Sequence, residues 1–275
     1  MKELFIKDIL ELKIDSKLSI SGWIKSIRRQ KKRTFIMLVD STGSIQVVYE
    51  GSRVALQNES SITVNGFLVK NKNTVEVFAE TIQVIGQVEL DAQYRPRKDL
   101  NIFASSFVSD MTTNRHLYIR NSKVIAVLKA RALVITALRA WFLRKNYCDV
   151  TAPILTPILL YSEDTGIRVP VNNQEVFLTQ CVGFYLESVV HSLEKVYNIG
   201  PSFRGKESSS KRHLTEYWHV KSELAFCAFD EFFGEVEDML RFVTQFVEKE
   251  AKILCLELGT GFNDEALRGK FPRVK

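Results

Sequence analysis

The chain has 275 residues, which is too long for one typical domain and sufficient for two. Its hydrophobic share of 45% and charged share of 25% are typical of a globular protein, and no run of about 18 apolar residues is present to cross a membrane. The net charge of +6 favours a polyanionic partner, although charge alone does not identify one.

The four cysteines are scattered along the sequence and form no CxxC pair. This distribution argues against a zinc site or a disulfide framework and favours a reducing compartment. The N-terminal residues mix charged with apolar side chains and lack the apolar core of a signal peptide. We therefore expect a cytoplasmic protein with no membrane partner.

Residues 1–88 consist mainly of short segments in which apolar and polar side chains alternate. A period of two residues and many β-branched side chains predict strands. The expected strands lie at about 18–24, 35–39, 45–48, 62–69 and 75–84. Turn-forming residues separate several of them. Five short strands with few helical signals favour a small closed barrel such as an OB-fold.

A basic segment joins the first two expected strands and contains Arg28, Arg29, Lys31, Lys32 and Arg33. An isolated run of this kind is usually a solvated hairpin tip. Here, however, Phe35 opens the next strand and Gln46 lies on the strand after it. An aromatic ring that stacks on a base, an amide that bonds a base edge and cations that meet phosphates together favour binding of single-stranded RNA.

The order and spacing of these features resemble the anticodon-binding domain of the aspartyl-, asparaginyl- and lysyl-tRNA synthetases. The resemblance is carried by Ile-Ser-Gly-Trp-Ile from residue 20, the basic loop, Thr-Phe-Ile-Met-Leu-Val-Asp from residue 34 and Ile-Gln-Val-Val from residue 45. In that family, the residues matching Phe35 and Gln46 contact the middle anticodon base. The resemblance therefore implies that the anticodon stem-loop of a tRNA is the partner.

Residues 89–115 are polar and contain a proline, which is typical of a linker, and we expect them to form a hinge. The sequence Asn-Arg-His-Leu-Tyr-Ile-Arg at 114–120 is similar to the element that leads from hinge to catalytic domain in asparaginyl and aspartyl enzymes. A second domain, 116–275, would then begin with a long amphipathic helix with Ser122 as its N-cap, ending near Lys145.

The segment after this helix is extended and contains Pro153. It could be an ordinary helix-to-strand junction. It also looks like motif 1 of class II synthetases, a helix and strand that form the dimer interface with a characteristic proline. That resemblance implies a homodimer.

Residues 196–226 closely resemble motif 2 of asparaginyl-tRNA synthetases, two antiparallel strands joined by a loop. The resemblance implies that Arg204 binds the α-phosphate of ATP and the carboxylate of the amino acid, where negative charge builds during adenylate formation. It implies that the loop residues Arg212, His213 and Leu214 face ATP and the tRNA acceptor end. Glu223 on the second strand would help to bind ATP or its Mg²⁺.

An upstream loop, Ser-Glu-Asp-Thr-Gly at 162–166, resembles a family loop whose glutamate holds the α-amino group of the substrate. Glu163 is the matching residue. A glutamate in a polar loop is otherwise simply solvated, and this loop is offset from motif 1 by a residue or two relative to the family pattern.

Several positions depart from the family pattern. Residues 177–187 match the family segment Leu-Thr-Gln-Ser-Ser-Gln-Leu-Tyr-Leu-Glu, but Gly183 stands where a substrate-recognising glutamine belongs, and Cys181 and Val182 replace small polar residues. Glycine has no side-chain donor or acceptor, so that contact is lost.

In motif 2, Lys206 reverses the charge of an expected glutamate. Glu207 comes one residue late, and on a strand a shift of one residue turns a side chain to the other face.

No segment fully matches motif 3, a glycine-rich strand and helix whose arginine binds the γ-phosphate of ATP. Gly259, Gly261 and Arg268 resemble it only superficially, because no apolar strand precedes them. The sequence thus predicts a truncated or degenerate member of the family that binds tRNA and does not activate an amino acid unaided. Two alternatives stay open, an active asparagine–tRNA ligase completed by another chain and a non-catalytic RNA-binding or regulatory module. The amino acid, asparagine, aspartate or neither, is also left open.

The predicted fold class is α+β. A five-stranded OB-fold barrel (1–88) and a hinge (89–115) precede part of a class II synthetase domain (116–275), which combines an antiparallel sheet with flanking helices.

Overall fold

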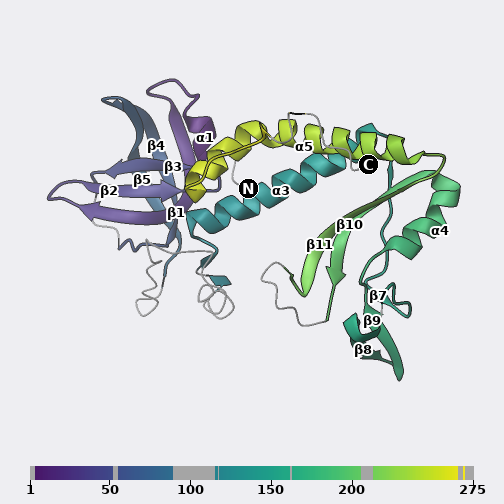
Figure 1. Ribbon diagram of the computed structural model, residues 1–275. Coiled ribbons are helices and arrows are strands. Elements are labelled where there is room, and N and C mark those ends of the chain that lie inside the picture. Colours follow the sequence, from purple (N-terminus) through teal and green to yellow (C-terminus); the bar gives the residue numbers. More distant parts are fainter. Residues whose placement is uncertain are drawn as a thin grey trace. The chain divides into compact units, whose positions relative to one another are not determined.

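The computed structural model describes residues 4–51, 55–88, 115–116, 118–161, 163–205, 213–265 and 269. The chain divides into two compact units, Met1–Arg95 and Pro96–Lys275 (Figure 1). Most of the expected hinge lies outside the described residues. Within those residues, no helix is both long and apolar enough to cross a membrane.

The first unit is a closed barrel with the strand order β1-β2-β3-β5-β4. Its elements are the short helix α1 (Ile6–Ile9) and the strands β1 (Lys17–Arg29), β2 (Thr34–Val39), β3 (Ser44–Tyr49), β4 (Ser61–Asn71) and β5 (Thr74–Gly86). β3 and β5 pair in parallel, and the other neighbours pair antiparallel. The predicted five-stranded barrel is confirmed.

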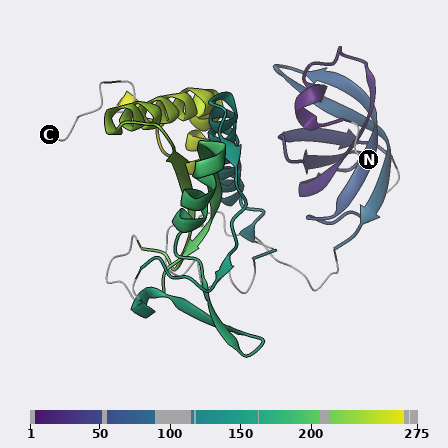
Figure 2. The same cartoon turned by 90° about the vertical axis from the view of Figure 1, so that its right-hand side faces the viewer.

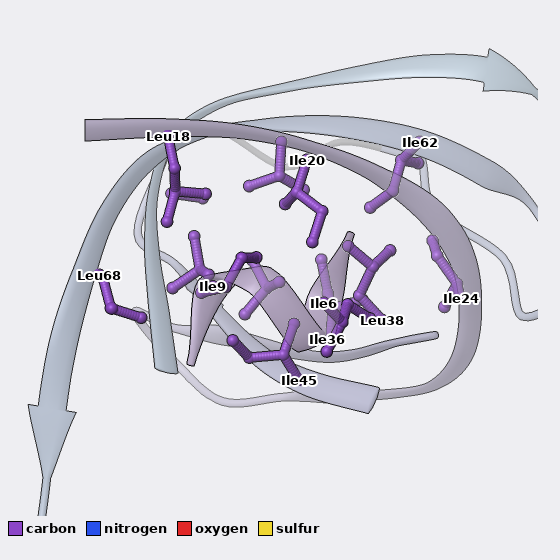
Figure 3. Close-up of a cluster of buried hydrophobic side chains, with 14 of the residues drawn as sticks. Ile6, Ile9, Leu18, Ile20, Ile24, Ile36, Leu38, Ile45, Ile62 and Leu68 are labelled. Atoms are coloured by element: carbon purple, nitrogen blue, oxygen red, sulfur yellow. The ribbon is translucent and has the colours of Figure 1, made fainter. Parts of the chain in front are cut away.

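The barrel core follows from the alternation in the sequence, because every second residue of a strand faces the same side. On β4, alternate residues from Ile62 to Leu68 are buried while their neighbours are half-buried. Isoleucine, leucine and valine side chains from all five strands fill the interior, and Ile6 and Ile9 of α1 are buried in the same cluster (Figure 3). The backbone N–H of Ile6 donates to Asp40 Oδ2 at 2.9 Å, which holds α1 against the β2–β3 turn.

Gly66 allows β4 and β5 to approach closely where the barrel bends. The pairing register of these strands shifts between Asn65 and Gly66. A Cβ atom at position 66 would lie 2.0 Å from the backbone oxygen of Phe78, which no side chain can accommodate without a backbone shift. A bulge with glycine at the close contact is a common way to curve a strand around a small barrel.

Among its described residues, the second unit combines two small sheets with the helices α3, α4 and α5. Its elements are α3 (Ser122–Arg144), β6 (Cys148–Asp149), β7 (Leu155–Thr156), the 3-10 turn η1 (Glu163–Thr165), β8 (Ile167–Val171), β9 (Gln174–Leu178), α4 (Gly183–Leu193), β10 (Lys195–Phe203), β11 (Glu216–Leu224) and α5 (Phe229–Leu258). One sheet has the order β11-β10-β6 and the other β7-β9-β8. The helices α3 and α5 lie side by side (Figures 1 and 2). The predicted α+β class is confirmed.

The start of α3 differs from expectation by one residue. The N-cap is Asn121, whose side-chain oxygen accepts a hydrogen bond from the backbone N–H of Lys123 at 2.9 Å. Ser122, the expected cap, is the first helical residue. Asparagine and serine cap helices about equally well, so the sequence did not separate these two neighbours. The helix ends at Arg144 with Lys145 as its C-cap, as predicted.

Aromatic packing joins α3 to one face of the β10–β11 hairpin. Phe142 of α3 and Tyr197 of β10 stack with their ring centroids 4.0 Å apart. Trp141 packs edge-on against Phe142 and donates from Nε1 to Asp238 of α5 at 2.9 Å. Lys145 also contacts Asp238, at 2.9 Å, and this hydrogen bond lowers the pKa of the Asp238 carboxyl. The hairpin and both helices therefore share one core.

We expect replacement of Phe142 by alanine to destabilise the second unit by about 3–5 kcal/mol, because the ring is 1% exposed and its loss leaves a cavity against Tyr197. The matched control is Leu143→Ala in the same helix turn, where the side chain is 76% exposed and the change should stay within about 0.5 kcal/mol. Urea unfolding of the full chain, followed by hydrogen exchange of peptides from α3 and β10, measures both. Equal losses in the two variants would contradict the assignment of the core.

Candidate functional site

The outer face of β1 and β2 carries a cation–aromatic pair. Because Ile36 and Leu38 point into the barrel, Phe35 and Met37 point outwards. Arg28 of β1 lies opposite Phe35 of β2, and its guanidinium carbon is 4.7 Å from the ring centroid. This distance is within the range of a cation–π interaction, so the two side chains form one amphipathic platform.

The amide of Gln46 lies on the same outer face and is oriented by a carboxylate. Gln46 on β3 is the cross-strand partner of Met37 on β2 and of Glu76 on β5. Its Nε2 donates to Glu76 Oε2 at 2.8 Å, and Asn71 donates to the same oxygen at 3.0 Å. The structure thus brings Phe35 and Gln46 to one surface, as predicted. Glu76 was missed, because only the parallel pairing of β3 with β5 places it there.

The basic segment between β1 and β2 forms a tight hairpin turn, closed by a hydrogen bond of 2.8 Å from Gln30 N–H to the Arg33 carbonyl. Lys31 and Lys32 are exposed at its tip. The other two basic side chains of the turn have partners in the barrel, since Arg29 donates to a backbone carbonyl and Arg33 pairs with Glu50. The predicted cationic rim therefore flanks the Phe35–Gln46 surface, and Arg28 belongs to both.

A second candidate surface is the face of the β10–β11 hairpin that points away from α3 and α5, called here the hairpin face. Alternation along the strands puts these side chains on it: Tyr217, His219, Lys221 and Glu223 of β11, with Asn198 and Ser202 of β10. The opposite face carries Tyr197 and Ile199 and belongs to the aromatic core. α4 packs against β10 through the cluster of Val182, Leu186 and Val196, which also covers part of the hairpin face.

Arg204 continues the row of Ser202 just beyond the end of β10, and its backbone N–H donates to the Thr215 carbonyl at 2.8 Å. Arg204 lies near Tyr217 of the hairpin face. Burial raises the pKa of the Tyr217 phenol, and the positive charge of Arg204 opposes this rise. His213 and Leu214 are exposed beside this end of β11. Arg212, Lys206 and Glu207 lie outside the described residues.

Glu163 lies in η1, and this turn is tied to the residue after Arg204, because Gly205 N–H donates to the Thr165 carbonyl at 2.9 Å. The carboxylate itself pairs with Arg168 of β8 at 3.2 Å, and its side chain is 77% exposed. The backbone hydrogen bond thus places η1, which carries Glu163, near Arg204. The Glu163 side chain is paired with Arg168, a residue that the sequence analysis did not single out.

Two residues that depart from the family pattern, Cys181 and Gly183, lie against the hairpin face. Phe203 N–H donates to the Thr179 carbonyl at 2.9 Å, which brings the segment leading into α4 alongside the end of β10. Lys221 Nζ donates to Cys181 Sγ at 3.2 Å. A Cβ atom on Gly183 would lie 2.7 Å from the same Nζ. The ammonium of Lys221 therefore occupies the space of the side chain that position 183 lacks.

The electrostatics of this cluster favour a thiolate–ammonium pair. Burial raises the pKa of the Cys181 thiol, but hydrogen bonds from His219 and Lys221 outweigh burial and bring the pKa down to about 7. Burial lowers the pKa of Lys221, and its bond to Cys181 more than compensates, so the pKa is raised. Both His219 and Lys221 were missed from the sequence, although they lie four and two residues before Glu223 on the same strand, which places them on its face.

Glu223, the predicted magnesium ligand, lies 3.9 Å from Lys221 Nζ at its nearest oxygen. In the described ranges, no group of three or more histidine, cysteine or acidic side chains is arranged to hold a metal ion. Magnesium in nucleotide sites is commonly bound by one or two carboxylates together with the phosphates, so Glu223 could take part only with ATP in place.

Comparison with known proteins identifies a family for each unit of the chain. The barrel belongs to a class of nucleic-acid-binding modules, because residues 18–85 match the family described as OB-fold nucleic acid binding domain. Residues 109–275 match the family of tRNA synthetases class II (D, K and N). The chain belongs to the class II tRNA synthetases of this D, K and N group.

Several relatives of the chain are asparaginyl enzymes. The asparagine–tRNA ligase of Thermoplasma acidophilum is 29% identical over 275 residues, covering 95% of this chain and 62% of the relative. The cytoplasmic asparagine–tRNA ligase of Saccharomyces cerevisiae is 31% identical, covering 96% of this chain and 49% of the relative. The crystal structure of asparaginyl-tRNA synthetase from Pyrococcus horikoshii complexed with asparaginyl-adenylate superposes with a TM-score of 0.83 at 26% identity, covering 98% of this chain and 62% of that one.

The asparaginyl-type resemblance seen in the sequence is therefore confirmed. The chain spans between about half and two thirds of the length of these relatives.

We expect the thiolate of Cys181 to form with an apparent pKa of about 7, and Lys221→Met to raise this pKa because it removes a donor to the thiolate. The measurement is the ultraviolet absorbance of the thiolate in the full chain as pH rises, minus that of Cys181→Ser. Because the folded pKa is depressed, the thiolate's contribution to stability should be complete above pH 9 and should be lost as pH falls through about 7. Cys148→Ser is the control, and a transition that persists in Cys181→Ser would refute the assignment.

Proposed function

We propose that this chain is an asparaginyl-type tRNA-binding protein whose barrel binds the anticodon stem-loop. The observation that carries the proposal is the single outer surface formed by Arg28, Phe35 and Gln46. Phe35 offers a ring on which an unpaired base can stack. Gln46, oriented through Glu76, offers its amide to a base edge. Lys31 and Lys32 at the hairpin tip supply positive charge for the phosphates.

Charge reversal at Arg28, Arg29, Lys31 and Lys32 should weaken binding of an anticodon stem-loop RNA and flatten its salt dependence. The slope of log affinity against log salt should fall by about 0.7 for each lost phosphate contact to single-stranded RNA. Fluorescence-anisotropy titrations at several salt concentrations measure both effects. Unchanged affinity and slope would remove the barrel from the proposed interface.

A second cation–aromatic pair on the same barrel provides the matched control. Lys17 of β1 lies opposite Phe67 of β4, with Nζ 5.8 Å from the ring centroid, so it repeats the Arg28–Phe35 arrangement on a different strand pair. Phe35→Leu should weaken RNA binding about tenfold or more, which corresponds to the loss of one stacked base, whereas Phe67→Leu should not. Equal effects would indicate general destabilisation of the barrel instead of lost stacking.

The second unit supports a partial site for ATP and an amino acid. Arg204 at the end of β10 is suited to a phosphate or a carboxylate, because a guanidinium bonds both in bidentate fashion. His213 and Leu214 lie beside it at the start of β11, and Arg212 belongs to the proposed set from its position in motif 2. Glu163 on η1 and Glu223 on β11 complete the set for the amino group and for the magnesium that accompanies ATP.

We propose further that the chain does not activate asparagine unaided. Gly183 offers no side chain to the substrate, and the Lys221 ammonium lies in the space concerned. Asparagine-dependent exchange between ATP and pyrophosphate by the pure chain should therefore stay at the level measured without amino acid. Exchange at a rate typical of a synthetase, about 1 per second or more, would show instead that the chain is an active ligase.

Two broader features of the family are proposed for this chain as well. A homodimer through α3 and the segment that follows it is supported by partly exposed apolar side chains on that helix, Ile125, Val127, Leu128 and Val134. A cytoplasmic location is supported by the scattered cysteines, all four of which are free.

A further inference from the structure

A thiol and an amine from distant parts of the chain lie in direct contact where α4 begins. Lys221 Nζ of β11 donates to Cys181 Sγ at 3.2 Å, although the two residues are 40 positions apart in the sequence. Gly183 leaves room for this contact, since a Cβ atom there would lie 2.7 Å from Nζ and 3.6 Å from Cε of Lys221. The fold therefore holds a nitrogen against a sulfur at a separation from which a bond can form, roughly 3–3.5 Å.

The sulfur has the surroundings of a cysteine that peroxides oxidise. Although burial opposes ionisation, hydrogen bonds from His219 and Lys221 favour the thiolate, which is the form that reacts with peroxide. Cys181 is 7% exposed and the Lys221 side chain 28%, so the pair is shielded from large reagents and open to a molecule as small as hydrogen peroxide. The thiols of Cys148 and Cys227 donate instead to backbone carbonyls, which do not condense with an oxidised sulfur.

We propose that Cys181 and Lys221 form a redox modification site, in which hydrogen peroxide converts the hydrogen-bonded pair into a covalent sulfenamide cross-link between sulfur and nitrogen. The cross-link would tie the start of α4 to β11 and would remove the charges of both side chains. This inference goes beyond the proposed function, because the cross-link needs neither RNA nor an amino acid.

The chemistry takes place in two steps. In the first step the thiolate attacks one peroxide oxygen: the O–O bond breaks, sulfur is oxidised to a sulfenic acid, and the other oxygen leaves as water after taking up a proton. In the second step the free amine of Lys221 attacks the sulfur: an S–N bond forms, the S–O bond breaks and a second water leaves. Overall the pair loses two hydrogen atoms, and the peroxide is reduced to water.

The first step also prepares the lysine for the second. Burial lowers the pKa of Lys221, and its bond to the Cys181 thiolate more than compensates and raises the pKa above its ordinary value. A protonated sulfenic acid is neutral, so oxidation removes the opposing charge and leaves burial to favour the free amine. His219, which is hydrogen-bonded to the same sulfur, is placed to take the ammonium proton. The pair is also faced by Tyr217 and Glu223 of β11 and by Tyr161.

Treatment of the full chain with hydrogen peroxide tests the proposal. Free thiols are then blocked, the chain is digested without reductant and the peptides are analysed by mass spectrometry. The peptides that contain Cys181 and Lys221 should be recovered joined, at the sum of their masses minus two hydrogen atoms, and dithiothreitol should separate them. In the urea-unfolded chain the yield of joined peptides should fall about tenfold or more, because the fold supplies the proximity.

Lys221→Arg separates the two roles of the lysine. It keeps a positive charge beside the sulfur, but a guanidinium stays protonated and does not attack, so Cys181 should be oxidised without forming the cross-link. Lys195→Met is the matched control, because Lys195 lies on the same hairpin but on the opposite face, with Nζ 5.5 Å from the Tyr147 ring centroid. It should leave the yield of the cross-link unchanged.

Recovery of Cys181 from the folded, peroxide-treated chain as an unlinked thiol, sulfinic acid or disulfide would overturn the inference. An equal yield of joined peptides from Lys221→Arg, or from the urea-unfolded chain, would overturn it as well. If the arginine variant does not fold, the comparison of the unsubstituted chain in buffer and in urea decides the question alone.

Discussion

The antiparallel ladder between β10 and β11 is the constraint on which the second unit depends. The pairing runs from Lys195 opposite Leu224 to Phe203 opposite Glu216 without a shift of register. A slip by one residue would turn every side chain of one strand to the other face, which would bury Lys221 against Phe142 and expose Val220. The aromatic core and the hairpin face are therefore two consequences of one register, and the stacking of Phe142 on Tyr197 indirectly fixes where Lys221 points.

The barrel shows how a repeated local arrangement acquires different roles. β1 pairs with β2 at one end and with β4 at the other, and each junction places a basic residue over a phenylalanine, at Arg28–Phe35 and at Lys17–Phe67. Only the first pair lies next to a hairpin rich in lysine and arginine and next to the amide of Gln46. The chemistry of the surroundings, and not the pair itself, favours RNA recognition at the first junction.

The sequence predicted what depends on local pattern and left open what depends on contacts between distant segments. The alternation of apolar and polar residues was sufficient to predict the barrel strands and to predict that Phe35 points outwards. Glu76 could not be foreseen, because it reaches Gln46 only through the parallel pairing of β3 with β5. Lys221, likewise, reaches Cys181 from a different element, 40 residues away in the sequence. Such partners are set by tertiary structure, which composition and spacing do not encode in a single sequence.

Gly183, Cys181 and Lys221 form one physical unit that the sequence did not reveal. Gly183 makes room for the Lys221 ammonium, and that ammonium, with His219, stabilises the thiolate of Cys181. A Cβ atom added at position 183 would lie 2.7 Å from Nζ of Lys221, so the end of the lysine side chain would have to move and Cys181 would lose one of its donors. Substitutions of residues in direct contact are generally not additive, so we expect changes at these three positions to be energetically coupled. The side chains at this end of the hairpin face therefore depend on one another for their positions.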